Sequence, residues 1–524
     1  MARNKELAGF LLFLSQFPLL QAAKILTISF IGGSHYLLMD EISRILHHNG
    51  HQVRMFQQIA DGMLPGRQAQ QSPYPVSTYS LGEEYIREYN AVFGKSQKEY
   101  LLGQHGVHNF LTFLNELSYQ CNVTLHQSDI LNFLMEEKYD LAVIDGSNPC
   151  CFLAAEKLGV PYIAFFPGTF MNAAKVGVIG PVSYVPSLQT QLTDHMDFFG
   201  RLKNTLMYLA SPIIERKMDV VFQKVIDEHF PLGSRPSIAD LHLKAELWIY
   251  NVDFTIEFPR PLLPNIQCIG GLLAKPAKPL TQELEDFIAE SGDSGFIVVT
   301  LGSMISSLPL VEFLKEMNDG FAKIPQKVIW RYKRSEWPQG VNVAHNVRLM
   351  DWVSQNDLLG HPKVHLLVTH GGMNSVMEAV YHGVPMVGIP LFGDQYANMV
   401  RVEARNLGTF ISPDQMKAEK FANTIREVIE NRRYKTSAMK RRAIMRTRPF
   451  PPDKQLLGWV EHIIQSGGGG HLRPYSYQQP WYQQFLLDVI LFLSACVAVI
   501  IYLILRVIRA PIYFLFSNRK QKEN

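Results

Sequence analysis

An excess of charge of one sign is what this sequence lacks most clearly. Fifty lysines and arginines stand against 47 aspartates and glutamates, a net charge of +3 over 524 residues. Proteins that bind nucleic acid through its phosphates have a pronounced basic excess, so we predict no nucleic-acid partner. Cysteine is scarce as well, and the five cysteines follow no spacing that indicates a zinc site or a disulfide framework. Whether any disulfide forms stays open.

Several cofactor and metal signatures are also missing. No G-x-G-x-x-G turn follows a strand, which argues against a nicotinamide enzyme. The sequence GKS at Gly94–Ser96 lacks the upstream glycine of a phosphate-binding loop, because Tyr89 occupies that place. The histidine-rich run His47–His51 is typical of a helix end with Gly50 as its stop, and no Asp-x-Asp pair occurs. We therefore predict neither a bound cofactor nor a metal requirement.

The two ends of the chain have apolar segments. Residues 1–23 begin with two basic side chains, continue through a short apolar core and end in Ala22 and Ala23, which predicts a cleaved signal peptide. An uncleaved anchor or a buried helix is the alternative. Near the other end, residues 489–505 contain no charge. Extended to 486–505, this segment matches the roughly 20 residues that cross a bilayer as a helix.

The distribution of charge after the apolar segment predicts the topology. Residues 506–524 contain five lysines and arginines against one acid, Glu523, which predicts a cytoplasmic tail and a lumenal main part. Lys520 and Lys522 resemble the dilysine signal of endoplasmic-reticulum membrane proteins, although a solvated charge run is the alternative. We expect a single-pass type I protein of that membrane. The sequon at Asn122 would then lie in the lumen and accept a glycan.

Apolar strands alternate with helices in two halves, which predicts two doubly wound α/β domains, each with a parallel sheet. Five strands are predicted in the second half. A proline- and glycine-rich segment, residues 259–280, connects the halves. The predicted parts are residues 24–280 for the N-terminal acceptor-binding domain with its linker, 281–470 for the C-terminal donor-binding domain, 471–485 for a lumenal juxtamembrane segment, 486–505 for the membrane helix and 506–524 for the tail.

Polar side chains follow the predicted strands of the second half. Ligands of doubly wound sheets bind at the carboxyl ends of the strands, so we expect these side chains to converge. Gly371 and Gly372 leave room for a ligand at the backbone, and the helix that begins near Asn374 offers free N–H groups to phosphate. The residues at this edge are Ser303, Trp352, Gln355, His370, Asp394 and Gln395.

The same stretch has a simpler interpretation. Ser375 and Glu378 have the spacing of a capping box, which would stabilise the helix without any ligand. Alternatively, Glu378 lies one turn below Asn374 and can accept both hydroxyls of a ribose, while Trp352 can stack on a base or belong to the core. The whole ordered set favours the ligand.

Two residues at the edge of the first sheet suggest the chemistry. His35 follows a strand and a Gly-Gly turn, and Asp145 ends the strand YDLAVID. A carboxylate beside one ring nitrogen orients an imidazole and stabilises its protonated form, so the pair can act as a base. Asp145 has an alternative explanation, because aspartate often ends a strand in a turn.

Residues Trp352–Gln395 closely resemble the signature of the UDP-glycosyltransferases, specifically the animal UDP-glucuronosyltransferases. The segments Lys24–Asp40, Gly271–Pro279 and Tyr477–Asp488 look most like the third subfamily. The resemblance implies a GT-B fold, a UDP-sugar as co-substrate and His35 with Asp145 as the base and its partner. It also implies donor contacts: Trp352 and Gln355 with uridine; His370, Asn374, Ser375 and nearby Ser303 with the diphosphate; Glu378 with ribose; Asp394 and Gln395 with the sugar; and Arg260 with the donor's charged groups.

The resemblance implies an inverting transfer from UDP-glucuronic acid, UDP-glucose, UDP-xylose or UDP-N-acetylglucosamine to a hydroxyl of a small lipophilic acceptor, for detoxification and elimination. Ala397 stands where many relatives have aspartate, and Phe392 presents an apolar face, which favours glucose or xylose. A non-catalytic lipid- or steroid-binding relative is the alternative function. The apolar span opposes a soluble secreted transferase. Homo- or hetero-oligomers stay open.

Overall fold

The structure, a computed structural model of the chain, describes residues 22–520 except 60–71, 105–106, 171–179, 188–189, 303–307 and 309. Residues 1–21 of the predicted signal peptide, the candidate Ser303 and Lys522 of the tail lie outside the described residues. The chain divides into two compact units, Met1–His471 and Leu472–Asn524. The first unit contains both sheets.

The first sheet has seven parallel strands in the order β3-β2-β1-β4-β5-β6-β7. Strand order reverses between β1 and β4, so the ends of these neighbours form the switch point at which such sheets bind ligands. The strands are β1 (Lys24–Ser29), β2 (Gln52–Ile59), β3 (Val76–Ser80), β4 (Leu141–Asp145), β5 (Tyr162–Phe166), β6 (Leu247–Tyr250) and β7 (Ile266–Cys268).

Helix α6 shows how the local sequence defines an element. Asn148 caps it by accepting a hydrogen bond from the backbone N–H of Cys150, Pro149 fills the first helical position and Gly159 ends it in a left-handed conformation. A disulfide joins Cys150 to Cys121 of α4, so the bond that the sequence left open is present. The helices of this half are α2 (Ser34–His48), α3 (Glu83–Leu101), α4 (Val107–Leu125), α5 (Ser128–Glu136), α6 (Pro149–Leu158), α7 (Phe198–His229) and α8 (Ile238–Lys244).

The second sheet has six parallel strands in the order β10-β9-β8-β11-β12-β13. Its switch point lies between β8 and β11. Five strands are predicted from the sequence; the three-residue β13 is the sixth, too short for a pattern of its own. The strands are β8 (Phe296–Thr300), β9 (Lys327–Arg331), β10 (Val347–Met350), β11 (Val364–Thr369), β12 (Met386–Gly388) and β13 (Gly408–Phe410).

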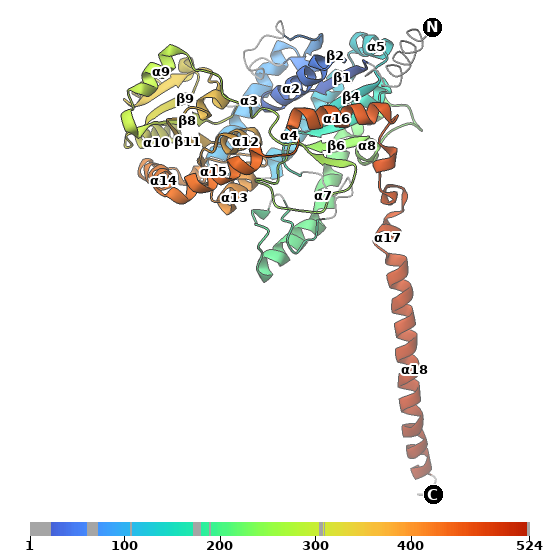
Figure 1. Cartoon of the computed structure of the whole chain (residues 1–524). Helices are drawn as coiled ribbons and strands as arrows, with labels where there is room; N and C mark the ends of the chain where they lie inside the picture. Colours follow the sequence, from blue (N-terminus) through green and yellow to red (C-terminus); the bar gives the residue numbers. More distant parts are fainter. Residues whose placement is uncertain are drawn as a thin grey trace, which may run out of the picture. The chain divides into compact units, whose positions relative to one another are not determined.

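Helices of the second half surround this sheet, and the last of them returns to the first half, where α16 packs against α2 (Figure 1). The helices are α9 (Gln282–Ala289), α10 (Val311–Phe321), α11 (Gln355–Leu359), α12 (Met373–His382), α13 (Gln395–Ala404), α14 (Ala418–Glu430), α15 (Arg432–Arg446) and α16 (Pro452–Gln465). Short 3-10 turns are η3 (Gly292–Ser294), η4 (Arg334–Glu336), η5 (Pro413–Gln415), η6 (Gly470–Leu472) and η7 (Tyr475–Gln478). The predicted architecture of two doubly wound α/β domains, each with a parallel sheet, is confirmed.

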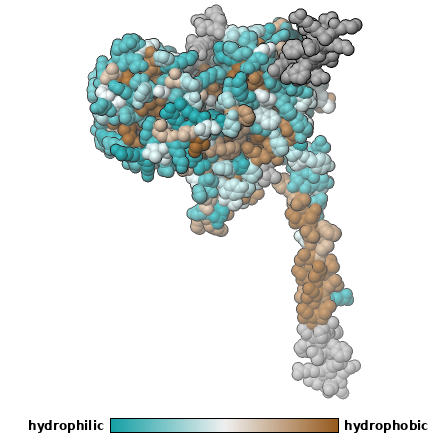
Figure 2. Space-filling view, viewed as in Figure 1, coloured by the Kyte–Doolittle hydropathy of each residue, from teal (hydrophilic) through white to brown (hydrophobic). Residues whose placement is uncertain are grey.

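The second unit consists mainly of α17 (Trp481–Gln484) and the long α18 (Leu487–Lys520). Among the described residues, one stretch of helix is long and apolar enough to cross a membrane, Leu487–Arg509, with a mean hydropathy of 2.7 and no buried part. Figure 2 shows apolar side chains along this stretch. The predicted apolar helix is therefore present, and it extends four residues beyond the expected end at residue 505.

Candidate active site

His35 and Asp145 meet at the switch point of the first sheet. Strand β1 is followed by Gly33, whose φ of 65° turns the chain into α2 and places His35 in its first turn. Asp145 is the last residue of the neighbouring β4 and is fully buried. Its Oδ2 lies 2.8 Å from His35 Nδ1, and its Oδ1 accepts from Ser147 N at 3.0 Å. The predicted pair is thus in contact.

The pair has the properties of a base and its partner. Burial lowers the pKa of His35, but the charge and hydrogen bond of Asp145, together with the charge of Asp394, raise it overall above its ordinary value. Donation from Nδ1 to the carboxylate leaves Nε2 as the acceptor for a proton. Because Asp394 belongs to the second half of the chain, His35 and the second half are within electrostatic range of each other.

Gln355, Ser375 and Glu378 form one hydrogen-bonded group. Gln355 Nε2 donates to Glu378 Oε2 at 2.6 Å and to Ser375 Oγ at 3.1 Å, and Thr300 donates to Gln355 Oε1. Burial raises the pKa of Glu378 to about 7, against the lowering effect of the Gln355 hydrogen bond. Helix α12 begins at Met373 after Gly372, without a side-chain cap. The alternative explanation of Ser375 and Glu378 as a capping box is therefore wrong.

His370 lies where two of the glycines leave space for it. A Cβ added to Gly302 or Gly372 would lie 2.6 Å or 2.5 Å from His370 Nε2, so the ring occupies the room that these residues provide. Gly371 has a φ of 86°, which favours glycine. Burial and the charge of Arg331 lower the pKa of His370 to about 4, which keeps the imidazole neutral. A neutral imidazole beside the free N–H groups of α12 can donate to phosphate oxygens.

Arg331 is a residue that our sequence analysis missed. It ends β9, donates to the carbonyl of Gly302 and places its guanidinium 4.9 Å from the ring of Trp352. Trp352 is 47% exposed, so part of the indole is accessible to a flat base that would stack on it. Arg331 could have been predicted from the sequence, because it is a polar residue at the end of a strand, as are the predicted site residues.

Asp394 projects from the start of α13 towards the first half of the chain. Its Oδ2 accepts from Asn398 Nδ2 at 2.9 Å, and a Cβ on Gly168, which follows β5, would lie 3.0 Å from the same oxygen. Burial raises the pKa of Asp394, with the Asn398 hydrogen bond as the main opposing effect. Gln395 Oε1 accepts from the backbone N–H of Leu391 at 2.7 Å, so this oxygen stabilises the loop that precedes α13.

Asn251, also missed, connects the two halves beside the predicted phosphate site. It follows β6, and its Nδ2 donates to Asn374 Oδ1 and to the carbonyl of Pro167, both at 2.9 Å. Its Oδ1 accepts from Gly271 N at 3.2 Å. These contacts fix the first turn of α12 against the first sheet.

Arg260 lies in a different set of contacts. Its guanidinium is 4.3 Å from the centre of the Phe170 ring and 4.0 Å from Glu257 Oε1, and its side chain is only 6% exposed. Burial lowers the pKa of Arg260, against the opposing effect of Glu257. The predicted contact of Arg260 with the donor's charged groups would therefore compete with its contact to the buried Glu257 carboxylate.

The sequon and the expectation of no metal remain predictions. Asn122 lies within α4, where its Oδ1 accepts from His229 Nε2 at 2.6 Å.

The ligand atoms of His126, Glu228 and His229 lie within 4.8 Å of one another. However, the Lys157 ammonium is 3.4 Å from His229 Nδ1, and a positive charge there opposes a cation.

Comparisons with known proteins agree on one family. The family model described as UDP-glucoronosyl and UDP-glucosyl transferase matches residues 23–522. UDP-glucuronosyltransferase 3A1 of Xenopus laevis is 57% identical over 98% of both chains, and UDP-glucuronosyltransferase 3A2 of Homo sapiens is 46% identical over 99% of this chain and 98% of its own.

Solved structures share the fold at low identity. The glycosyltransferase SnogD from Streptomyces nogalater superposes with a TM-score of 0.54 at 16% identity, over 84% of this chain and 99% of its own. The glycotransferase of kitacinnamycin gives 0.56, also at 16% identity, over 84% and 98%. The GT-B arrangement expected from the sequence is confirmed by these neighbours.

Proposed function

Because the chain belongs to the UDP-glucoronosyl and UDP-glucosyl transferase family and is a UDP-glycosyltransferase, we propose that it transfers a neutral sugar to a hydroxyl of a small lipophilic acceptor with inversion at the anomeric carbon. The main support is the 2.8 Å contact between His35 and Asp145, together with the electrostatic coupling of His35 to Asp394. The base thus faces the residue that would hold the donor's sugar.

The donor would extend along the carboxyl edge of the second sheet. Trp352 stacks on uracil, while Gln355 and Glu378 take the uridine, with both ribose hydroxyls donating to the carboxylate. The diphosphate lies at the start of α12, beside His370, Asn374 and Ser375, with Ser303 from outside the described residues. Asp394 and Gln395 take the sugar hydroxyls. Dipoles and neutral donors fixed in place before reaction stabilise the charge that develops on the leaving diphosphate.

The transfer is a single displacement. His35 Nε2 removes the acceptor's hydroxyl proton as the oxygen bonds to the anomeric carbon, and the bond from that carbon to the diphosphate oxygen breaks. The bonding pair leaves with UDP, so an α-linked donor gives a β-glycoside. Asp145 stabilises the imidazolium, which afterwards loses its proton to water.

Three features favour glucose or xylose over charged or acetamido sugars. Phe392, beside Asp394, packs its ring 5.8 Å from that of Tyr100, which leaves an apolar wall without hydrogen-bond partners for an amide. Ala397 supplies no polar group. Arg260, the cation predicted to meet the donor's charge, is paired with Glu257. A uronate carboxylate would thus meet the buried Asp394 carboxylate, which disfavours a second negative charge nearby.

Donor competition tests this proposal. We expect UDP release with UDP-glucose or UDP-xylose over a panel of phenols and lipophilic alcohols, with UDP-N-acetylglucosamine and UDP-glucuronic acid much poorer. Exclusive use of the acetamido or the uronic-acid donor would contradict the assignment. Conjugation of such acceptors for elimination would be the physiological role.

We also propose that the first unit faces the lumen of the endoplasmic reticulum. The basic residues after the apolar stretch, Lys520 and Lys522 among them, support this orientation. Protease protection in sealed microsomes, with an epitope tag placed ahead of α17 in one version and beyond residue 524 in another, would test it. Loss of the first tag rather than the second would reverse the topology.

A further inference from the structure

Helix α7 presents an exposed apolar face to the outside of the first unit. Six side chains spaced by three, four or seven residues share this face, and they are 45% to 68% exposed. A single exposed leucine is ordinary, but a continuous stripe marks an interaction surface. The stripe consists of Phe198, Leu202, Leu206, Leu209, Ile213 and Val220.

The orientation of the stripe is fixed by polar contacts on the opposite side of the helix. Asn204, fully buried, donates to the carbonyls of Val182 and Val185, both at 2.8 Å, and accepts from Ser187 N at 2.7 Å. Lys203 donates to the carbonyl of Thr190 at 2.7 Å. Along its first half the helix thus turns Asn204 inward and the apolar stripe outward, whereas Phe222, Val225 and Ile226 of its second half pack into the core.

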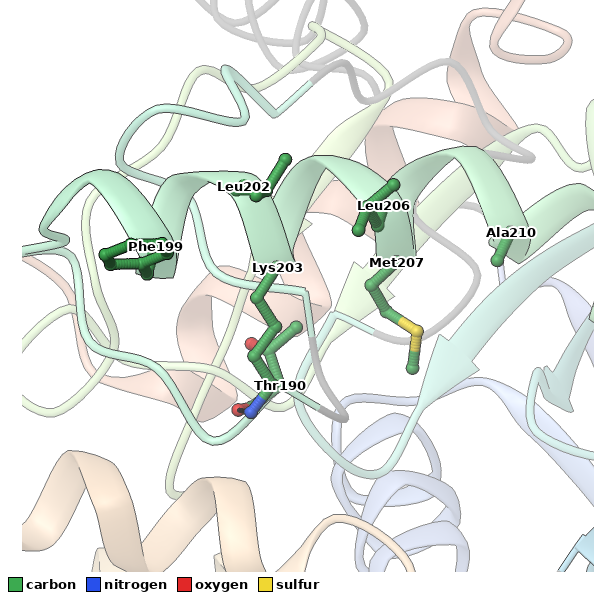
Figure 3. Close-up of a pocket in the computed structure, with 7 residues that line it drawn as sticks. All are labelled: Thr190, Phe199, Leu202, Lys203, Leu206, Met207 and Ala210. Carbon is green, nitrogen blue, oxygen red and sulfur yellow. Dashed lines mark hydrogen bonds between the residues drawn. The ribbon is translucent and has the colours of Figure 1, made fainter.

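The surface beside the stripe is hollowed. A depression of about 500 Å³ lies along the helix, lined among others by Phe199, Leu206 and Met207. Figure 3 shows Leu202 and Leu206 leaving α7 one turn apart, and Figure 1 shows the beginning of α7 extending beyond the sheets. A rough apolar surface of this kind suits flexible acyl chains better than a flat, rigid partner.

We propose that the apolar stripe of α7 docks into the surface of a lipid bilayer, the same bilayer that α18 crosses. After the first unit ends at His471, only residues 472–486 precede α18, and these span at most about 50 Å when extended. The first unit is therefore held close to the bilayer, which presents its surface at a high effective concentration.

Charge supports the same occupant. Residues 198–220 contain four basic residues against two acids, and three of the four, Arg201, Arg216 and Lys217, are exposed and separate from the Lys203 contact with Thr190. Basic side chains flanking an apolar helical face are typical of helices that lie in the interface and contact anionic headgroups. The stripe would also bring the first half of the chain to the phase in which lipophilic acceptors dissolve.

The test uses the full chain reconstituted into nanodiscs, so that incorporation itself reports whether α18 inserts. In a background with Cys268→Ser and Cys496→Ser, one variant has Leu209→Cys and a control has Leu232→Cys, at a residue that is 86% exposed and lies after α7. Each thiol receives an environment-sensitive fluorophore. Discs are made with phosphatidylcholine and phosphatidylserine, with or without bromine on the acyl chains.

We expect a blue-shifted emission at position 209 that brominated lipid quenches at least twofold, and a solvent-like, unquenched emission at position 232. UDP release confirms that both variants are folded. Emission at 209 that resembles the control would overturn the proposal. A blue shift without bromine quenching would overturn it too, since the stripe would then contact a second copy of the chain.

Discussion

Arg401 Nε donates to Glu257 Oε1 at 2.7 Å, and the two side chains are only 3% and 2% exposed. Arg401 Nη2 also donates to Thr169 Oγ1 at 3.1 Å, and Thr169 donates to the second carboxylate oxygen of Glu257. The three residues come from both halves of the chain. Because Arg401 belongs to α13, which begins directly after Asp394, this buried group fixes the helix that presents Asp394 to His35.

Loss of the Arg401 charge should therefore destabilise the fold. Arg401→Met leaves the Glu257 carboxylate buried without its principal counter-charge, and we expect the free energy of unfolding to fall by about 3–5 kcal/mol. Urea unfolding followed by tryptophan fluorescence measures it. The double variant Glu257→Gln with Arg401→Met should recover only part of the loss, since the buried Arg260 guanidinium then lacks the Glu257 carboxylate. Equal midpoints for the single variant and wild type would argue against a stabilising pair.

Removal of the proposed base should stop turnover without removing the donor site. For His35→Ala we expect kcat to fall on the order of 10²–10⁴-fold, while the KM for the UDP-sugar changes little. His345→Ala, an exposed histidine of the other half, is the matched control and should keep wild-type turnover. Undiminished UDP release by His35→Ala would remove the base assignment and favour a different acceptor-activating group.

The pH dependence should report the carboxylate beside His35. The base must be neutral, so the rate falls as the pH drops through the folded-state pKa of His35, which Asp145 holds above its ordinary value. In Asp145→Asn this support is lost, so the acid limb of kcat/KM should move to lower pH while the plateau decreases. A limb that stays in place would show that Asp145 does not govern the titration.

The sequence located most of the candidate site because one rule covers it: side chains at the ends of parallel strands meet at one edge. His35 with Asp145, and Gln355 with Ser375 and Glu378, lie together as this rule predicts. Arg331 and Asn251 obey the same rule but were missed, since each looks like the ordinary polar end of a strand.

Other features depend on packing that no local pattern reveals. The partnership of Arg260 with Glu257 requires both to be buried beside Arg401, a residue of the other half. The disulfide requires α4 to lie against α6, although Cys121 and Cys150 are 29 residues apart. The exposed face of α7 is apolar in the sequence, but only the inward contacts of Asn204 show that this face is turned outward.

The disulfide gives a prediction of its own. Closing a loop of 29 residues should stabilise the first unit by about 3–4 kcal/mol, chiefly by limiting the unfolded chain. The double variant Cys121→Ser with Cys150→Ser should show this loss in urea unfolding, and wild type should approach it in reductant. Cys268→Ser, which leaves the bond intact, is the control. Insensitivity of the wild type to reductant would indicate that the thiols stay unlinked.

Replacing Glu378 with glutamine should stabilise the fold at alkaline pH and at the same time weaken binding of the UDP-sugar. The pKa of Glu378 rises from about 4.3 in an unfolded chain to about 7 in the fold. Between these values the native state binds a proton that the unfolded state lacks, so stability falls as pH rises through this window. At about pH 8, Glu378→Gln should therefore unfold later than wild type, by on the order of 2 kcal/mol. The same change removes the charged acceptor of two ribose hydroxyls, so the KM for the UDP-sugar should rise about tenfold. A purely structural Glu378 predicts a less stable variant with an unchanged KM, and thermal unfolding with donor titrations at one pH separates the two outcomes.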